Sequence, residues 1–168
     1  MPIKKVASLA SATLAVIFHA APALAQPAPI PDQVAVEGAW SRATPPGAQT
    51  GAVYLTLTSP AGDRLVGASS PSSRKAEVHE MRMEGPVMRM REATDGLDLP
   101  AGQHVALAPG GYHLMLVDLA APLKQGQTVH VRLTFQKSPP AEVDVPIGAV
   151  GAAAPPGTVQ PMPDMKRP

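Results

Sequence analysis

The stretch TVHVRLTF, Thr128–Phe135, alternates apolar and polar residues at every position. Successive side chains of a β-strand point to opposite faces, so this alternation places one set towards a core and the other towards water. The inward set is Val129, Val131, Leu133 and Phe135, and the outward set is His130, Arg132 and Thr134. The stretch therefore predicts a half-buried β-strand with His130 on its solvent face.

The same period of two recurs along much of the chain, in short runs separated by Gly, Pro, Asp and Ser. These runs are VAVEGAW, GAVYLTLT, RLVGAS, KAEVHEMRME, PVMRMRE, HVALA, YHLMLVDL and EVDVPI. No stretch of ten or more residues shows an amphipathic helical pattern. The pattern predicts an all-β sandwich or barrel of about eight or nine short strands. In it, His104 faces water, whereas Trp40 and Tyr54 pack in the core or at a barrel end.

The first 25 residues have the features of a secretory signal peptide. Two lysines precede an apolar run over residues 6–18, and Ala23-Leu24-Ala25 resembles a cleavage site. The run is shorter than the roughly 20 residues that a membrane-spanning helix needs, so export is favoured over stable membrane insertion. We therefore expect the protein in the periplasm.

The remaining chain divides by composition. Residues 26–32, rich in Pro, predict an extended leader, and residues 33–149 hold all the alternating runs. Residues 150–168 mix Gly, Ala and Pro without apolar periodicity, which predicts a flexible tail containing Met162 and Met165. The sequence thus predicts one β-domain between two irregular segments.

Charge and cysteine content exclude several classes of partner and site. Removing residues 1–25 takes 2 of the 14 Lys and Arg and none of the 13 Asp and Glu, which leaves 12 minus 13, or −1. Neither nucleic acid nor an anionic membrane surface is an expected partner for such a domain. The chain has no cysteine, so it offers no disulfide and no thiolate. A metal would be held by nitrogen, oxygen or thioether sulfur.

The stretch VHEMRMEGPVMRM, residues 78–90, contains four of the eight methionines beside a histidine. Alternation places His79, Met81 and Met83 on one face, opposite the charged residues between them. After the turn at Glu84-Gly85-Pro86, Met88 and Met90 again share a face, so a hairpin could bring both sets onto one surface.

A third run adds the same chemistry. In YHLMLVDL, His113 and Met115 lie two residues apart on one face, just after the turn-forming Pro109-Gly110-Gly111. Their Cα atoms would lie about 6.6 Å apart along a strand, so both side chains can converge on one ion.

Imidazole and thioether without thiolate form a soft donor set that suits Cu(I). Zinc would favour cysteine, histidine or carboxylate ligands, and a blue-copper site requires cysteine. Calcium or magnesium would need an oxygen cage, whereas Glu80 and Glu84 fall on the opposite face. Methionine also fills cores, and for Met81, Met83 and Met88 taken singly packing is the preferred interpretation.

The motif carries a resemblance to a known family. The order His79, Met90, then His113-x-Met115, with the flanking strings HEMRM, VMRMR and PGGYHLML, resembles the PCuAC family of periplasmic copper chaperones. The likeness extends to AWSRATPPGAQTGAVYLTL and RLVGASSP, and so covers nearly all of residues 33–149.

The resemblance implies a cupredoxin-like Greek-key β-barrel with one Cu(I) in a His2Met2 site near one end. The family's ligands fall on His79, Met90, His113 and Met115. The resemblance also implies delivery of copper to the copper-A centre of cytochrome c oxidase, with a thioredoxin-like protein of the Sco type as a further partner. Relatives with His- and Met-rich tails bind a second copper there, but this tail contains no histidine, so a Cu(II) site in it is not expected.

Other functions stay open at this point. A copper buffer or resistance protein would use the same ligands, and a β-sandwich assembly module would use the methionines only for packing. A copper enzyme or haem protein with His and Met ligands is a further alternative. The sequence supplies no activated nucleophile or acid and base pair of a hydrolase, so we expect a non-enzyme, and no feature requires more than a monomer.

Overall fold

The computed structural model describes residues 33–157, which contain ten β-strands and no helix. The strands are β1 (Ala35–Arg42), β2 (Thr50–Thr58), β3 (Asp63–Ser69), β4 (Ser73–Glu84), β5 (Val87–Glu92), β6 (Leu97–Leu99), β7 (His104–Leu107), β8 (Tyr112–Leu119), β9 (Thr128–Phe135) and β10 (Ala141–Gly148). Within the described part, no helix is long and apolar enough to span a membrane.

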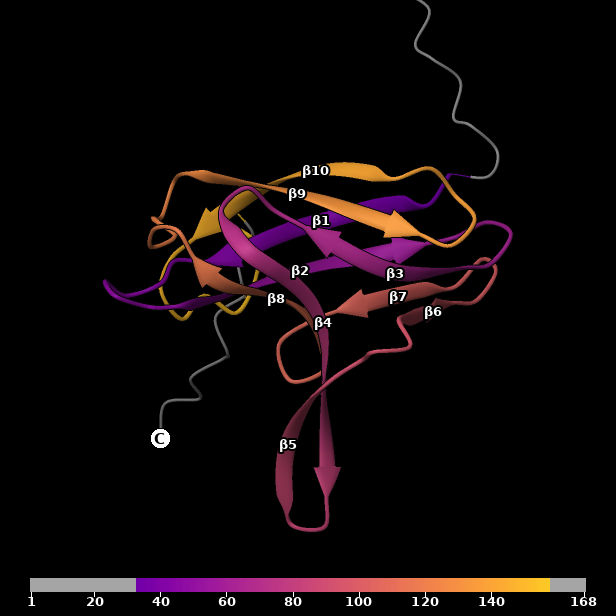
Figure 1. Cartoon of the computed structure of the whole chain (residues 1–168), viewed down its shortest axis with the longest axis horizontal. Coiled ribbons are helices and arrows are strands. Elements are labelled where there is room, and N and C mark those ends of the chain that lie inside the picture. Colours follow the sequence, from indigo (N-terminus) through magenta and orange to yellow (C-terminus); the bar gives the residue numbers. More distant parts are fainter. Residues whose placement is uncertain (1–32, 158–168) are drawn as a thin grey trace, which may run out of the picture.

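Seven of the strands form a closed barrel (Figure 1). Their order is β4-β8-β2-β1-β10-β9-β3, and β3 pairs back to β4 at Ala68 and Ala76. β1 and β10 run parallel, and the other strand pairs are antiparallel. The predicted all-β barrel is confirmed. It has one strand more than the nine alternating runs because β6 contains three residues, too few to show an alternation.

The interior is built from the inward-facing residues of the alternating runs. In β9, every second residue is buried, as the pattern of Thr128–Phe135 predicts. Trp40 and Tyr54 are buried with ring centroids 4.7 Å apart, and His104 and His130 are exposed, so these expectations are also confirmed. The tightly packed barrel gives the strands that carry the candidate site a fixed register.

One hairpin leaves the barrel. β4 pairs with β8 only as far as Glu80, and its last residues pair with β5 alone. The resulting arm, residues 81–91, projects away from the barrel, below it in the view of Figure 1. Gly85, with a φ of 62°, and Pro86 form the two-residue turn at its tip. The hairpin predicted from the methionine-rich stretch is present.

The two irregular segments lie mostly beyond the described residues. The predicted signal peptide and leader, residues 1–32, lie outside them, as do residues 158–168 with Met162 and Met165. The first part of the predicted tail is described, and there the Nε of Arg42 donates a 2.6 Å hydrogen bond to the carbonyl of Ala152.

Candidate metal centre

The two histidines of the candidate site face each other across neighbouring strands. His79 on β4 and His113 on β8 are direct register partners, and their ring centroids lie 5.9 Å apart. Their chain neighbours Val78 and Leu114 are buried in the core, so both imidazoles point to the outer face of the barrel. His113 is nevertheless only 7% exposed. The site is therefore shallow but covered, at the base of the arm.

Backbone geometry fixes the proton on His113. Its Nδ1 lies 3.1 Å from the carbonyl of Gly111, which can only accept, so Nδ1–H donates. In the neutral ring the Nε2 atom then carries a lone pair. Gly111 is held by a type II turn, with Pro109 followed by Gly110 at φ 87° and a 3.1 Å hydrogen bond from Gly111 N–H to the carbonyl of Ala108.

The free nitrogen of His113 faces the sulfur of Met90. Nε2 lies 3.3 Å from the Sδ atom of Met90, which belongs to β5 of the arm. With Nδ1 as the proton donor to Gly111, the Nε2 atom of the neutral ring carries a lone pair and faces the lone pairs of the sulfur. Two electron-pair donors at this distance can share one soft cation.

His79 has its own fixed orientation. Its Nε2 lies 3.2 Å from a carboxylate oxygen of Glu77, so Nε2–H donates and Nδ1 carries the lone pair. That Nδ1 atom is buried and has no hydrogen-bond partner among the described residues. An unpaired buried polar atom costs about 1–3 kcal/mol, and a bound metal ion would remove that cost. The donor set thus fits a soft metal ion.

Glu77 was not among the residues predicted for the site. Glu80 and Glu84 fall on the opposite face, but Glu77 is two residues before His79 and shares its face. The signal was available in the same alternation. A carboxylate that holds the second nitrogen of a metal-binding imidazole is a common supporting arrangement in metal sites.

Met115, the fourth predicted ligand, lies at the border of the group formed by His79, Met90 and His113. It is half-buried on the outer face of β8, two residues beyond His113, and its register partners are Glu77 on β4 and Ala52 on β2. Its Cα is therefore a diagonal neighbour of His79, about 7–8 Å away. The structure brings His79, Met90 and His113 into one group and places Met115 at its border.

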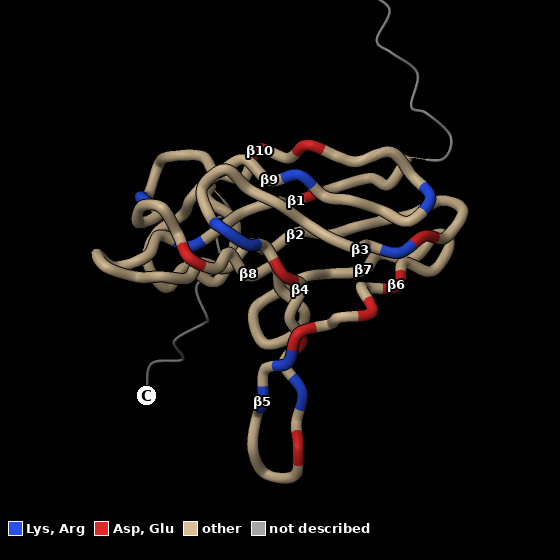
Figure 2. The backbone as a smooth tube through the Cα atoms, in the orientation of Figure 1, with Lys and Arg blue, Asp and Glu red and all other residues tan. Residues whose placement is uncertain are grey.

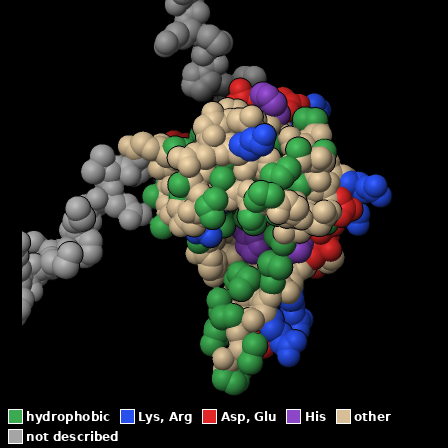
Figure 3. All heavy atoms as spheres, turned by 90° about the vertical axis from the view of Figure 1, so that its left-hand side faces the viewer, with side chains coloured by type: hydrophobic (Ala, Val, Ile, Leu, Met, Phe, Trp, Pro, Cys, Tyr) green, Lys and Arg blue, Asp and Glu red, His purple; other side chains and the backbone are tan. Residues whose placement is uncertain are grey.

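The structure corrects the packing interpretation for two of the other methionines. Met83 is 58% exposed and Met88 is 45% exposed, so neither fills the core. Met81 is partly buried and is the register partner of Met90. The three residues lie on the arm, where charged residues occur along both strands (Figure 2). Figure 3 shows the basic side chains on one side of the arm and the apolar side chains on the other.

Glu80 is engaged away from the site. It is the register partner of Tyr112 and accepts a hydrogen bond from the phenol. Burial, followed by the charge and hydrogen bond of Glu80, raises the pKa of Tyr112, which therefore stays protonated at neutral pH. This pair braces the junction between β4 and β8 rather than supplying a ligand.

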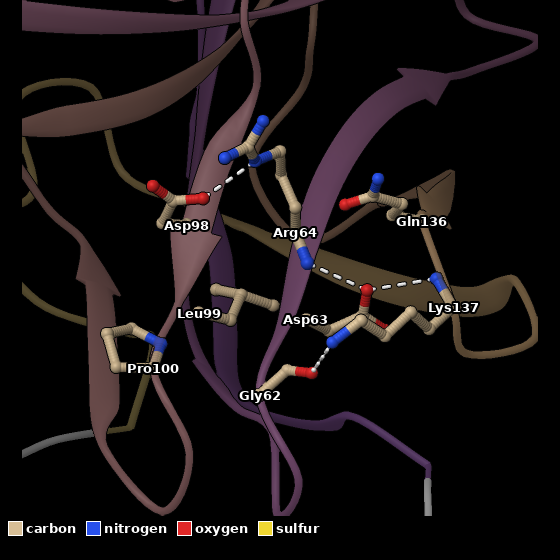
Figure 4. A pocket seen from close by; sticks show the side chains of 8 residues that line it. All are labelled: Gly62, Asp63, Arg64, Asp98, Leu99, Pro100, Gln136 and Lys137. Atoms are coloured by element: carbon tan, nitrogen blue, oxygen red, sulfur yellow. Dashed lines mark hydrogen bonds and ion pairs between the residues drawn. The ribbon is translucent and has the colours of Figure 1, made fainter.

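A separate hollow of about 390 Å³ lies near β3, β6 and β9 and is lined in part by the ion pair of Arg64 and Asp98 (Figure 4). Asp63 lies there and accepts backbone hydrogen bonds from Arg64 (2.7 Å), Lys137 (3.0 Å) and Ser138 (2.8 Å). Burial alone would raise the pKa of Asp63, but hydrogen bonds, foremost that of the Ser138 side chain and then those of the three backbone N–H groups, lower it from 3.8 to about 2. These bonds tie the β9–β10 loop to β3, which is a structural role.

In the described residues, no three His, Asp or Glu side chains are grouped where they could hold a metal ion. The group at the base of the arm differs from such sites because sulfur is among its donors.

Residues 34–147 match the model of the family described as "Putative lipoprotein LpqE-like". The chain belongs to this family. The LpqE-like chain is also 36% identical over 127 residues to "Putative lipoprotein Lxx21020" of Leifsonia xyli subsp. xyli (strain CTCB07), a match that covers 75% of this chain and 76% of the relative.

Solved structures similar to the LpqE-like chain include PCuAC domains. The copper-bound PCuAC domain from PmoF2 is 26% identical, with a TM-score of 0.57, over 70% of this chain and 93% of that domain. The solution structure of CuI-DR1885 from Deinococcus radiodurans is 29% identical, with a TM-score of 0.56, over 71% of this chain and 79% of that protein. The predicted cupredoxin-like fold is confirmed, and the resemblance to PCuAC domains agrees with this likeness.

Proposed function

We propose that this LpqE-like protein is a copper chaperone that holds one Cu(I) ion at the base of the arm. The ligands are Nδ1 of His79, Nε2 of His113 and the sulfur atoms of Met90 and Met115. The observation that carries the proposal is the contact of His113 Nε2 with the Met90 sulfur at 3.3 Å, with Nδ1 engaged by the Gly111 carbonyl, beside the unpaired Nδ1 of His79. The copper named in the similar PCuAC domain and in CuI-DR1885 supports the choice of metal.

The donor types favour the lower oxidation state. Thioether sulfur is a soft, neutral ligand that binds Cu(I) well, whereas Cu(II) prefers nitrogen and oxygen. Two imidazoles and two thioethers leave the single positive charge of Cu(I) uncompensated by the ligands themselves. The Glu77 carboxylate at 3.2 Å from His79 supplies a nearby negative charge without occupying a ligand position.

Accessibility favours transfer over permanent storage. Met90 is 46% exposed and belongs to an arm that only β4 and β5 build, so this ligand can be displaced from solvent. A partner could replace Met90 first and then remove the ion from the two histidines by ligand exchange. No redox or hydrolytic step is needed, so we propose a non-enzyme.

The destination follows from the resemblance to PCuAC proteins. We propose the copper-A centre of cytochrome c oxidase as acceptor and a Sco-type thioredoxin-like protein as a second partner. We place the protein in the cell envelope, in agreement with the lipoprotein descriptions of its family and relative. We propose that residues 1–25 direct export into the periplasm.

An anaerobic Cu(I) titration of the exported protein against a chromophoric chelator tests the proposal. We expect one tight equivalent, weakened by Met90→Leu or by Met115→Leu. The matched control is Met162→Leu with Met165→Leu, which removes two thioethers from the tail and should leave the tight equivalent unchanged. Failure of the unaltered protein to compete with the chelator would refute copper binding.

A copper buffer would bind the ion equally well, so binding does not distinguish it from a chaperone. The second test mixes the Cu(I)-loaded protein with an apo copper-A domain and follows the copper-A absorption after oxidation. Transfer in minutes supports delivery, whereas retention of the ion by the LpqE-like protein supports buffering.

A further inference from the structure

The arm carries four methionines in two facing pairs. The register of β4 and β5 places Met81 opposite Met90 and Met83 opposite Met88. All four side chains lie on one face of the hairpin, because each is two residues from the next along its strand. The arm therefore carries two pairs of thioethers between its tip and the histidines. We call Met83 and Met88 the outer rung and Met81 and Met90 the inner rung.

The turn determines how close the partners of each rung are. In a hairpin with a two-residue turn, the residues that flank the turn, here Glu84 and Val87, form a hydrogen-bonded pair. Hydrogen-bonded and non-hydrogen-bonded pairs alternate, so both methionine rungs are non-hydrogen-bonded pairs, in which side chains lie closest. The hydrogen bond from Ala93 N–H to the carbonyl of Val78 (2.8 Å), six residues from the turn on each strand, agrees with this phase.

The outer rung is not explained by packing. Met83 is 58% exposed and Met88 is 45% exposed, so neither belongs to the buried core. Figure 3 shows apolar side chains along one side of the projecting arm and basic side chains along the other, with histidine at the base. Basic side chains of the far face are held by Glu84, which pairs with Arg89 (3.1 Å) and Arg91. The charges thus stay away from the sulfur atoms.

We propose that Met83 and Met88 form a second, weaker Cu(I) site at the tip of the arm, which captures the ion and passes it inward to the histidine centre. This inference rests on the proposed function. Facing methionines have Cβ atoms about 4.5–5.5 Å apart, and three rotatable bonds in each side chain allow both sulfur atoms to turn onto one ion. Two thioethers bind Cu(I) less tightly than the mixed set with imidazole.

Met90 connects the two sites. It is the register partner of Met81 in the inner rung, and its sulfur lies 3.3 Å from Nε2 of His113. The two rungs lie about 6.8 Å apart along the strand, a distance that flexible methionine side chains can span by exchanging one ligand at a time. The copper stays Cu(I) throughout, and thioethers release no proton when they bind it, so the passage needs no other reactant.

Methionine methyl NMR tests the proposal. The exported protein, labelled with 13C at the methionine methyl groups, is titrated anaerobically with Cu(I). We expect the first equivalent to shift the signals of Met90 and Met115 and the second to shift those of Met83 and Met88. In the double variant Met83→Leu with Met88→Leu, the second shift should be lost while the first remains, because exposed Met-to-Leu changes keep the hairpin's volume and register.

A kinetic measurement separates capture from chance binding. Stopped-flow loading from a Cu(I)–chelator complex should be slower in this double variant, with unchanged affinity for the first equivalent. Val87→Leu, an apolar change at the same tip, should load at the normal rate. A second equivalent that shifts only Met162 and Met165, or equal loading rates, would overturn the tip site alone. Absence of any shift at Met90 would overturn the proposed function as well.

Discussion

Removal of the Glu77 carboxylate should weaken Cu(I) binding although Glu77 is not a ligand. In the structure its oxygen accepts the Nε2–H of His79 at 3.2 Å and thereby leaves Nδ1 free and buried. Without that acceptor the ring can carry its proton on Nδ1 or rotate, and each alternative must be reversed before the metal binds. Loss of such a supporting group typically costs 10–100-fold in metal affinity, or roughly 1.4–2.7 kcal/mol.

The assay is the anaerobic competition titration, applied to Glu77→Ala and to Glu92→Ala. Glu92 is the matched control because it is the register partner of His79 on β5 and its removal deletes the same charge. We expect Glu77→Ala to lower the Cu(I) affinity more than Glu92→Ala does. Equal losses in the two variants would show that charge, and not the orientation of His79, is what matters. An unchanged affinity in Glu77→Ala would refute the reasoning outright.

The same reasoning predicts tautomers that 15N NMR of the imidazoles can read directly in the metal-free protein: the Nε2–H form for His79 and the Nδ1–H form for His113. Burial opposes the shift, but hydrogen bonds lower the pKa of Asp63 to about 2, below its ordinary 3.8. Its stabilising contribution is therefore complete above about pH 5 and is lost as the pH falls through 2; it amounts to roughly 1–2 kcal/mol after allowance for solvent. Urea unfolding should therefore show that Asp63→Asn destabilises the protein at neutral pH and much less near pH 2. Gly96 has a φ of 81°, and an added Cβ would lie 2.5 Å from the carbonyl oxygen of Leu65. Gly96→Ala should therefore lower the free energy of unfolding by about 1–3 kcal/mol. The control Gly67→Ala, with nothing within 4 Å of its Cβ, should lower it by about 1 kcal/mol or less.

The alternation of apolar residues predicted most of the fold and the composition of the candidate site. Nine of the ten strands correspond to alternating runs, and β6 was missed because three residues show no period. The same parity put His79 and the arm methionines on one face, as the register confirms. The same alternation places Glu77 on the face of His79, but Glu77 was not predicted as a site residue because it lies just before the methionine-rich stretch.

Exposure of the arm methionines could not be predicted in the same way. Alternation states which residues share a face, but whether that face is covered depends on what packs against it. Met83 and Met88 are exposed because they lie on the arm beyond the barrel, where β4 and β5 pair only with each other among the described strands. The burial of a face is a property of the assembled sheet.

The sequence by itself determined the class of fold and the kinds of donor, because side-chain direction along a strand is a local property of the backbone. Only the tertiary structure decided that His79 meets His113 in register, that Gly111 and Glu77 leave one nitrogen free on each ring, and that Met90 reaches His113 from the arm. These contacts join residues up to 34 positions apart, and their register depends on barrel closure and strand pairing across the whole domain.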